Sequence, residues 1–139
     1  MALIKTKNIA ITGSTNWQDK TKLKTTIFQL KQTFGSKVRV IGCGAKLGAD
    51  PYIKKYSLDF DLDYAEFPPY DQQWNHYCIK PAYLYNKSKS HRYYGMRNSQ
   101  LAKEADILIV FVMDCDEYKP YQDLIDQFQK RNKKVIVVK

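Results

Sequence analysis

The sequence predicts an α/β fold in which a doubly wound, mainly parallel sheet of five strands carries helices on both faces. Short apolar strands alternate with helical patterns along the chain, and such alternation is typical of parallel sheets. The predicted strands are almost entirely apolar, as expected for strands that are covered on both faces. Two of them run directly into turns of small residues, which are typical of strand-to-helix connections at a ligand site.

In the first half of the chain, the pattern of residues predicts a strand, a helix and a second strand. Residues 7–12 form the first strand, and a turn of small residues follows at 13–16. Asp19 is typical of a helix N-cap, and Gly35 of a helix end. Between them, apolar side chains recur at helical spacing, namely Leu23, Ile27, Leu30 and Phe34. Residues 38–41 then form the central strand.

A glycine-rich turn follows the central strand. Gly42, Gly44 and Gly48 allow the backbone to turn sharply and to approach an anion closely. Asp50 stands where the next helix should begin, as an N-cap with Pro51 at the first helical position. Because helix N-termini bind phosphate, the turn indicates either a phosphate cradle or a plain tight turn between strand and helix.

The remaining elements follow in the same alternating order. A short helix is marked by Ile53, Tyr56 and Phe60, and a third strand is expected at 61–67. A helix at 97–105 leads into the clearest buried strand of the sequence, at 106–112. Pro120 opens the last helix, and residues 135–138 form the closing strand.

Residues 68–92 show no regular period and are rich in aromatic and then basic side chains. A segment of this length inside a compact domain is either functional or partly helical. Its aromatic rings suit a lid that stacks on a nucleobase. Together with Lys87, Lys89 and Arg92 they also suit a platform for single-stranded nucleic acid. The third interpretation is a small satellite core or a contact between subunits.

Composition limits the classes of function. The 139 residues suit one domain, without an internal repeat or linker. No run is long and apolar enough for a membrane span or a signal peptide, and three irregularly spaced cysteines suggest no disulfide framework, so a cytoplasmic protein is expected. The histidines and cysteines lack the spacing of a metal site. The net charge of +9 favours anionic partners.

Three ordered motifs carry a resemblance to a known family. They are Ile11-Thr-Gly-Ser14 with Trp17 close behind, then the stretch 42–50, and then Tyr94-Gly-Met-Arg-Asn98. These segments resemble the T-G-S-R-x-W, G-G-A-x-G-A-D and R-N elements of the SLOG superfamily in its YspA-like branch. The resemblance implies one SLOG-like domain over 1–139 with a Rossmann-like, nucleotide-binding sheet. Such proteins occur in bacteria and their viruses, often beside nucleotide signalling or defence systems.

The resemblance also implies the residues of a site at the carboxyl-terminal edge of the sheet. Its implied members are Gly13, Ser14, Trp17, Gly42, Cys43, Gly44, Gly48, Asp50, Arg97 and Asn98. The chemistry of the side chains agrees with this. The planar guanidinium of Arg97 matches phosphate, and the Asn98 amide both donates and accepts hydrogen bonds.

The sequence departs from the family where catalysis would be expected. Thr15 replaces the usual arginine, and Cys43 replaces the second glycine of the usual pair. Hydrolytic relatives, such as the cytokinin-activating phosphoribohydrolases, carry P-G-G-x-G-T-x-x-E after the fourth strand, whereas this chain has Asp114, Asp116 and Glu117 there. These carboxylates suit either Mg²⁺ or acid–base work, or a solvated loop.

We expect a protein that binds a nucleotide or a nucleotide-derived ligand, as a sensor, a sequestering protein or a weak processing enzyme. No cofactor is assigned beyond Mg²⁺ accompanying the ligand. One alternative is a single-stranded nucleic-acid-binding protein related to DNA-processing protein A. The other is a nucleotide hydrolase of the phosphoribohydrolase type. No membrane partner is expected, and a homo-oligomer is left open.

Overall fold

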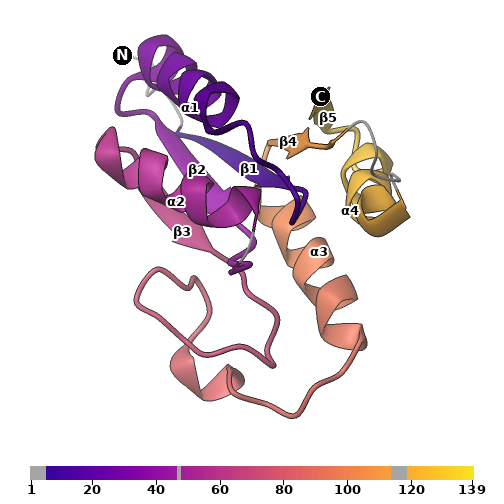
Figure 1. Cartoon of the computed structure of the whole chain (residues 1–139). Coiled ribbons are helices and arrows are strands. Elements are labelled where there is room, and N and C mark those ends of the chain that lie inside the picture. Colours follow the sequence, from indigo (N-terminus) through magenta and orange to yellow (C-terminus); the bar gives the residue numbers. More distant parts are fainter. Residues whose placement is uncertain (1–5, 47, 114–118) are drawn as a thin grey trace, which may run out of the picture.

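The computed structural model describes residues 6–46, 48–113 and 119–139. Its core is one sheet of five parallel strands in the order β3-β2-β1-β4-β5, so the predicted α/β class is confirmed (Figure 1). The order reverses between β1 and β4, which lie side by side although one is the first strand and the other the fourth. The strands are β1 Lys7–Gly13, β2 Val38–Gly42, β3 Asp63–Glu66, β4 Ile107–Phe111 and β5 Lys134–Val138.

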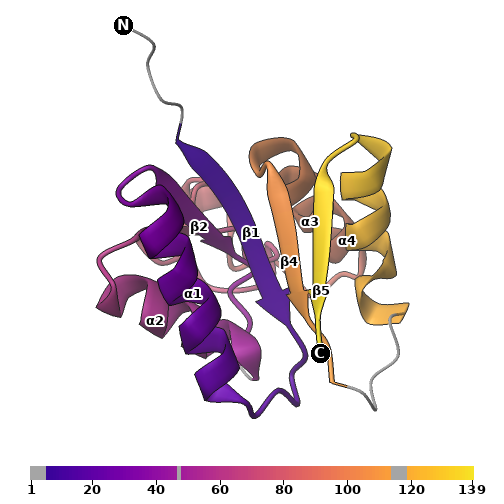
Figure 2. The same cartoon turned by 90° about the horizontal axis from the view of Figure 1, so that it is seen from above.

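Helices cover both faces of the sheet (Figure 2). One face carries α1 and α2, and the other carries α3 and α4. Because successive side chains of a strand point to opposite faces, Ile9 and Ile11 of β1 pack under the first pair and Ala10 packs under the second. The helices are α1 Lys20–Phe34, α2 Ala49–Asp59, α3 Arg92–Glu104 and α4 Lys119–Lys130, with one short 3-10 helix, η1 Ala82–Leu84. None of the helices in the described ranges is long and apolar enough to cross a membrane.

The local signals for α1 are confirmed at both ends. The Asp19 carboxylate accepts a hydrogen bond from the backbone N–H of Lys22 at 3.0 Å, so it caps the helix as expected. Gly35 ends the helix with φ 59°, a backbone conformation that favours glycine. The Leu23 and Ile27 side chains point into the sheet and are fully buried.

Two element boundaries differ from expectation for identifiable reasons. The third strand begins at Asp63 rather than at residue 61, because Asp61 turns the chain out of α2 with φ 57°. Helix α3 begins at Arg92 rather than at residue 97. Its first turn packs back onto the preceding segment, where the Tyr93 ring meets the Tyr70 ring edge to face at 5.7 Å.

The segment 68–92 combines buried and exposed aromatic side chains. Tyr70 makes a second edge-to-face contact with Tyr85, which is buried, so part of the segment forms the small satellite core that was one of its interpretations. Backbone bonds also join it to the edge strand β3, from Glu66 N–H to Tyr77 O and from Ile79 N–H to Glu66 O. These bonds fix residues 77–79 of the segment beside the end of β3.

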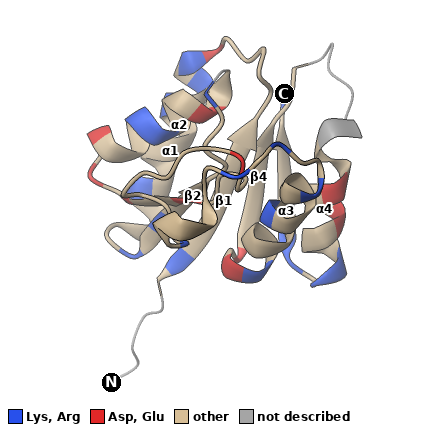
Figure 3. Cartoon of the chain, turned by 90° about the horizontal axis from the view of Figure 1, so that it is seen from below, with Lys and Arg blue, Asp and Glu red and all other residues tan. Residues whose placement is uncertain are grey.

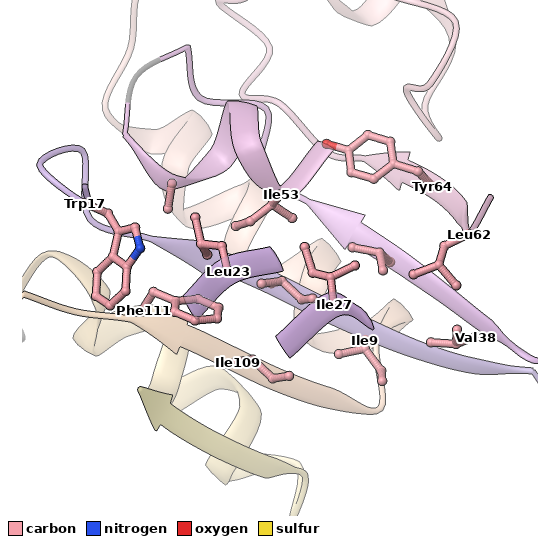
Figure 4. Packing of buried hydrophobic residues seen from close by; sticks show 13 residues of the cluster. Ile9, Trp17, Leu23, Ile27, Val38, Ile53, Leu62, Tyr64, Ile109 and Phe111 are labelled. Carbon is pink, nitrogen blue, oxygen red and sulfur yellow. The ribbon is translucent and has the colours of Figure 1, made fainter. Parts of the chain in front are cut away.

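The Trp17 side chain lies in the core beside Phe111 of β4 (Figure 4). It is 5 % exposed, and its ring meets Phe111 of β4 edge to face at 5.3 Å. Its indole N–H donates to the Asp19 carbonyl at 2.8 Å. The site role that the sequence resemblance implied for Trp17 is therefore not supported by its position.

We predict that Trp17→Ala lowers the free energy of unfolding by about 3–5 kcal/mol, because it removes a large buried ring and leaves a cavity. Trp74→Ala is the matched control: Trp74 is 46 % exposed, and its loss should change stability by less than about 0.5 kcal/mol. Urea unfolding followed by circular dichroism measures both. Equal effects of the two substitutions would contradict the core placement of Trp17.

Candidate functional site

A cleft of ≈ 470 Å³ lies at the carboxyl-terminal edge of the sheet. Its walls come from the turns that follow β1 and β2 and from α3 and α4, so it lies at the point where the strand order reverses. Ligands of doubly wound sheets bind at such a point. The lining residues are Thr12, Gly13, Thr15, Cys43, Gly44, Ala45, Lys46, Asp50, Pro69, Gln72, Tyr94, Arg97 and Tyr121.

Asp50 does not cap α2, which corrects the expectation from the sequence. The helix begins at Ala49, and Gly48 occupies the cap position with φ 76°. The Asp50 side chain lies in the first turn and is turned back toward the sheet, where it accepts a hydrogen bond from Thr12 Oγ1 at 2.9 Å. Its second oxygen accepts from the backbone N–H of Ala45 at 3.2 Å. Asp50 therefore ties the glycine-rich turn to β1.

Pro51 is accordingly the third residue of α2 rather than the first. A proline is tolerated there because the N–H groups of a first helical turn have no partner within the helix.

The turn after β1 packs directly against the start of α2. Ala49 N–H donates to Ser14 O at 3.1 Å, so the two backbones are in contact. A Cβ at Gly48 would lie 2.3 Å from Ser14 O, and one at Gly13 would lie 2.8 Å from the Ala49 Cβ. Both glycines are therefore required by close packing, and at Gly48 also by the positive φ.

Arg97 forms the wall of the cleft on the side of α3. Its Nη1 donates to the Cys43 carbonyl at 3.4 Å and its Nε to Asn98 Oδ1 at 2.9 Å. The guanidinium carbon also lies 5.6 Å from the centre of the Tyr94 ring, three residues earlier on the same helix face. These contacts hold the planar guanidinium across the cleft from the turn after β1.

Backbone donors complete the cationic side of the cleft. The N–H groups of Thr15, Gly44 and Lys46 make no hydrogen bond to another residue within the described ranges. Thr15 and Lys46 are also exposed at the mouth of the cleft, where the Lys46 ammonium adds a second positive charge to that of Arg97. Donors and charges of this kind are suited to an anion.

Burial dominates the electrostatics of the two titratable groups at the base of the cleft. Desolvation raises the pKa of Asp50 to about 6, although hydrogen bonds from Thr12 and Ala45 and the charge of Arg97 oppose the rise. Desolvation also raises the pKa of the Cys43 thiol. Cys43 is therefore a buried thiol that packs in the turn, and it lacks the lowered pKa of a reactive cysteine.

The structure brings half of the sequence-predicted site residues into the lining of the cleft: Gly13, Cys43, Gly44, Asp50 and Arg97. The others lie behind it and support it, namely Ser14, Trp17, Gly42, Gly48 and Asn98. Asn98 is 7 % exposed, and its amide donates to Asp123 of α4 at 3.0 Å, so it joins two helices. A Cβ at Gly42 would collide with the Tyr64 hydroxyl, which explains that glycine by packing.

Several lining residues were missed by sequence reasoning. Lys46 sits inside the glycine-rich turn, and Tyr94 precedes Arg97 by one helical turn, so both carried a local signal. Thr12 stood in the first of the three motifs but was not counted among the site residues. Gln72 and Tyr121 reach the cleft only through the fold, and no sequence pattern marked them. The predicted acidic group of Asp114, Asp116 and Glu117 lies outside the described residues.

Comparison with known proteins bears on the fold. No family model and no curated protein matches the sequence. Among solved structures, the chain is similar to the molybdenum cofactor binding protein from the phototrophic bacterium Rippkaea orientalis, with a TM-score of 0.68 and 15% identity. The match covers 98% of this chain and 77% of that chain. The likeness confirms the Rossmann-like fold. Membership of the SLOG superfamily, and of its YspA-like branch, stays a prediction.

Proposed function

We propose that this protein binds a nucleotide or a nucleotide-derived ligand, with a phosphate of the ligand seated in the cleft at the carboxyl-terminal edge of the sheet. One observation carries the proposal: Arg97, Lys46 and the glycine-rich turn converge on a single cleft at the reversal of strand order. The two cations come from different elements, one from α3 and one from the turn after β2.

The position of the phosphate follows from the available donors. The Arg97 guanidinium offers a planar donor pair, and Lys46, from the turn after β2, offers an ammonium. The N–H groups of Thr15 and Gly44 lie in the two turns that line the cleft between them. A phosphate with three or four oxygens can accept from all of these groups at once.

The solved neighbour supports a small-molecule ligand. That protein is described as binding the molybdenum cofactor. A cofactor of that kind therefore belongs, beside simple nucleotides, among the ligands that should be tried on this chain.

Binding is a better-supported proposal than hydrolysis. The described part of the cleft contains one carboxylate, Asp50, and its two oxygens already accept hydrogen bonds from Thr12 and Ala45. We therefore assign no general base, and Mg²⁺ remains an accompaniment of the ligand. Figure 3 shows Lys and Arg spread over several helices and the loop. This distribution does not favour the nucleic-acid alternative over a small ligand.

The direct test is thermal unfolding in the presence of nucleoside mono-, di- and triphosphates, cyclic nucleotides and NAD derivatives. A ligand at one hundred times its dissociation constant should stabilise the protein by about 2.7 kcal/mol. The absence of any stabilisation at millimolar concentration would contradict the proposal.

We predict that Arg97→Ala weakens the best ligand by about 10- to 150-fold, or about 1.5–3 kcal/mol, through loss of a charge-assisted hydrogen bond. Lys103→Ala is the matched control: it removes one positive charge from the same helix, at an exposed position outside the cleft. Isothermal titration calorimetry measures both affinities. An equal loss in the two variants would show that only the overall charge of the protein matters.

The buried carboxylate of Asp50 makes the stability of the folded protein depend on pH. In the folded protein its pKa is about 6, against a reference value of 3.8. The folded state therefore holds this proton more tightly than the unfolded state does. The stabilisation due to protonated Asp50 is fully present below pH ~4 and is lost as pH rises through ~6.

We predict that Asp50→Asn removes this dependence. The difference in unfolding free energy between Asp50→Asn and the wild type should shift in favour of the variant by about 2.4 kcal/mol from pH 4 to pH 7. Asp59→Asn, at an exposed position at the end of the same helix, should show a far smaller shift. Urea unfolding from pH 4 to pH 7 measures the free energies of all three proteins. If the difference between Asp50→Asn and the wild type does not change with pH, the raised pKa of Asp50 is contradicted.

A further inference from the structure

A second, smaller cavity of ≈ 160 Å³ opens beside the main cleft at the end of β3. Gly44, Lys46 and Gln72 line both cavities, so the two adjoin across the glycine-rich turn. The remaining lining residues are Glu66, Pro68, Gln73, Trp74 and Asn75. Cavities of about 150 Å³ take up a benzene ring, so this volume suits one ring system rather than a whole nucleotide.

A buried carboxylate forms one side of the small cavity. Glu66 is 2 % exposed, and its Oε2 accepts a hydrogen bond from the Tyr64 hydroxyl at 2.7 Å. Its Oε1 accepts from the Asn75 side-chain amide, and the Lys54 ammonium lies 4.0 Å from Oε2. These contacts fix the carboxylate in place. Because each carboxylate oxygen has two lone pairs, both retain the capacity to accept one more hydrogen bond.

Gly44, which has no side chain, lies between the two cavities. A Cβ at this position would lie 3.5 Å from Glu66 Cδ and 3.0 Å from Pro68 Cγ. Any side chain here would therefore stand between the Glu66 carboxylate and the main cleft. The positive φ of 76° also favours glycine. The passage between the phosphate donors and Glu66 thus depends on this residue.

An exposed indole also lines the cavity. Trp74 is 46 % exposed, and it belongs to the segment that the Glu66 to Tyr77 backbone bond fixes beside β3. The side-chain amides of Gln72, Gln73 and Asn75 line the same space. An aromatic face beside convergent polar groups is the usual composition of a site for a heterocyclic base.

We propose that this cavity is the base-recognition subsite of the ligand, and that it selects a ring carrying two neighbouring N–H donors, as in the 2-amino-6-oxo edge of guanine. The subsite rests on the proposed function, since the phosphate of the same ligand would lie near Arg97 and Lys46. The two Glu66 oxygens accept from the ring N–H and the amino group, and Trp74 stacks on the ring.

The chemistry of a carboxylate accounts for the selectivity. Both Glu66 oxygens are acceptors, so they match two adjacent donors. Adenine presents an amino donor beside a ring-nitrogen acceptor, and cytosine does the same, so one Glu66 oxygen would face an acceptor. Hypoxanthine keeps the ring N–H but lacks the amino group. A ligand that leaves a buried polar group of the site unpaired is rejected strongly.

The test is calorimetry with guanosine, inosine and adenosine 5′-monophosphates, which share one phosphate and differ at the base edge. Guanosine monophosphate should bind at least tenfold more tightly than adenosine monophosphate, with inosine monophosphate between them. A pterin phosphate carries the same edge as guanine. Tighter binding of the pterin phosphate than of guanosine monophosphate would support recognition of the same edge, and it would identify the preferred ligand as a pterin.

Two variants separate the roles of the subsite. In Glu66→Gln the amide oxygen can still accept from Asn75, and the amide N–H can donate to the Tyr64 hydroxyl instead of accepting from it. The variant therefore loses one acceptor, and the guanosine-to-adenosine preference should fall to less than about threefold. Glu104→Gln, at the opposite end of the sheet, should leave the preference unchanged. Trp74→Ala should weaken all three nucleotides by about tenfold, through lost stacking. Tyr83→Ala, an exposed aromatic outside both cavities, is its control.

The failure of this inference differs from the failure of the proposed function. If the three nucleotides bind equally, and lose affinity equally in Arg97→Ala, the phosphate site stands and the base subsite is wrong. If Glu66→Gln leaves the preference intact, Glu66 is not the selecting group. If neither a nucleotide nor a pterin phosphate binds to the wild type, both proposals are wrong.

Discussion

The backbone of Ser14 touches the first turn of α2, and the rest of the site depends on that contact. Ala49 N–H donates to Ser14 O, and neither Gly13 nor Gly48 has room for a Cβ. The contact brings the turn after β1 against the helix that follows β2. The Asp50 carboxylate closes the junction, because it accepts from Thr12 on one strand and from Ala45 in the next turn.

The order of the strands places this junction beside the cleft. Helices α1 and α2 cover one face of the sheet and α3 and α4 the other, so the strand order reverses beside β1. Arg97 on α3 therefore meets the turn after β2, where its Nη1 donates to the Cys43 carbonyl. The segment 68–92 leaves β3 beside the same edge. Its side chains Gln72 and Trp74 extend the cleft toward Glu66.

Local sequence signals predicted the elements better than the side-chain roles. Asp19 and Gly35 marked both ends of α1 because capping depends on neighbouring residues alone. Asp50 matched the same pattern, yet its true partner, Thr12, lies 38 residues earlier and becomes a neighbour only in the sheet. Trp17 belonged to a family motif, and its burial depends on Phe111 from β4. Contacts of this range leave no local signal.

The most direct test of the account is the location of the bound ligand. Amide chemical shifts from ¹⁵N NMR, followed during titration with the best-stabilising nucleotide, report which backbone groups it meets. We expect the largest changes at Thr15, Gly44 and Lys46, in the two turns that line the cleft, with smaller changes along β5. Changes concentrated on the exposed faces of α1 and α2, with the two turns unaffected, would contradict the central claim that this cleft binds the phosphate.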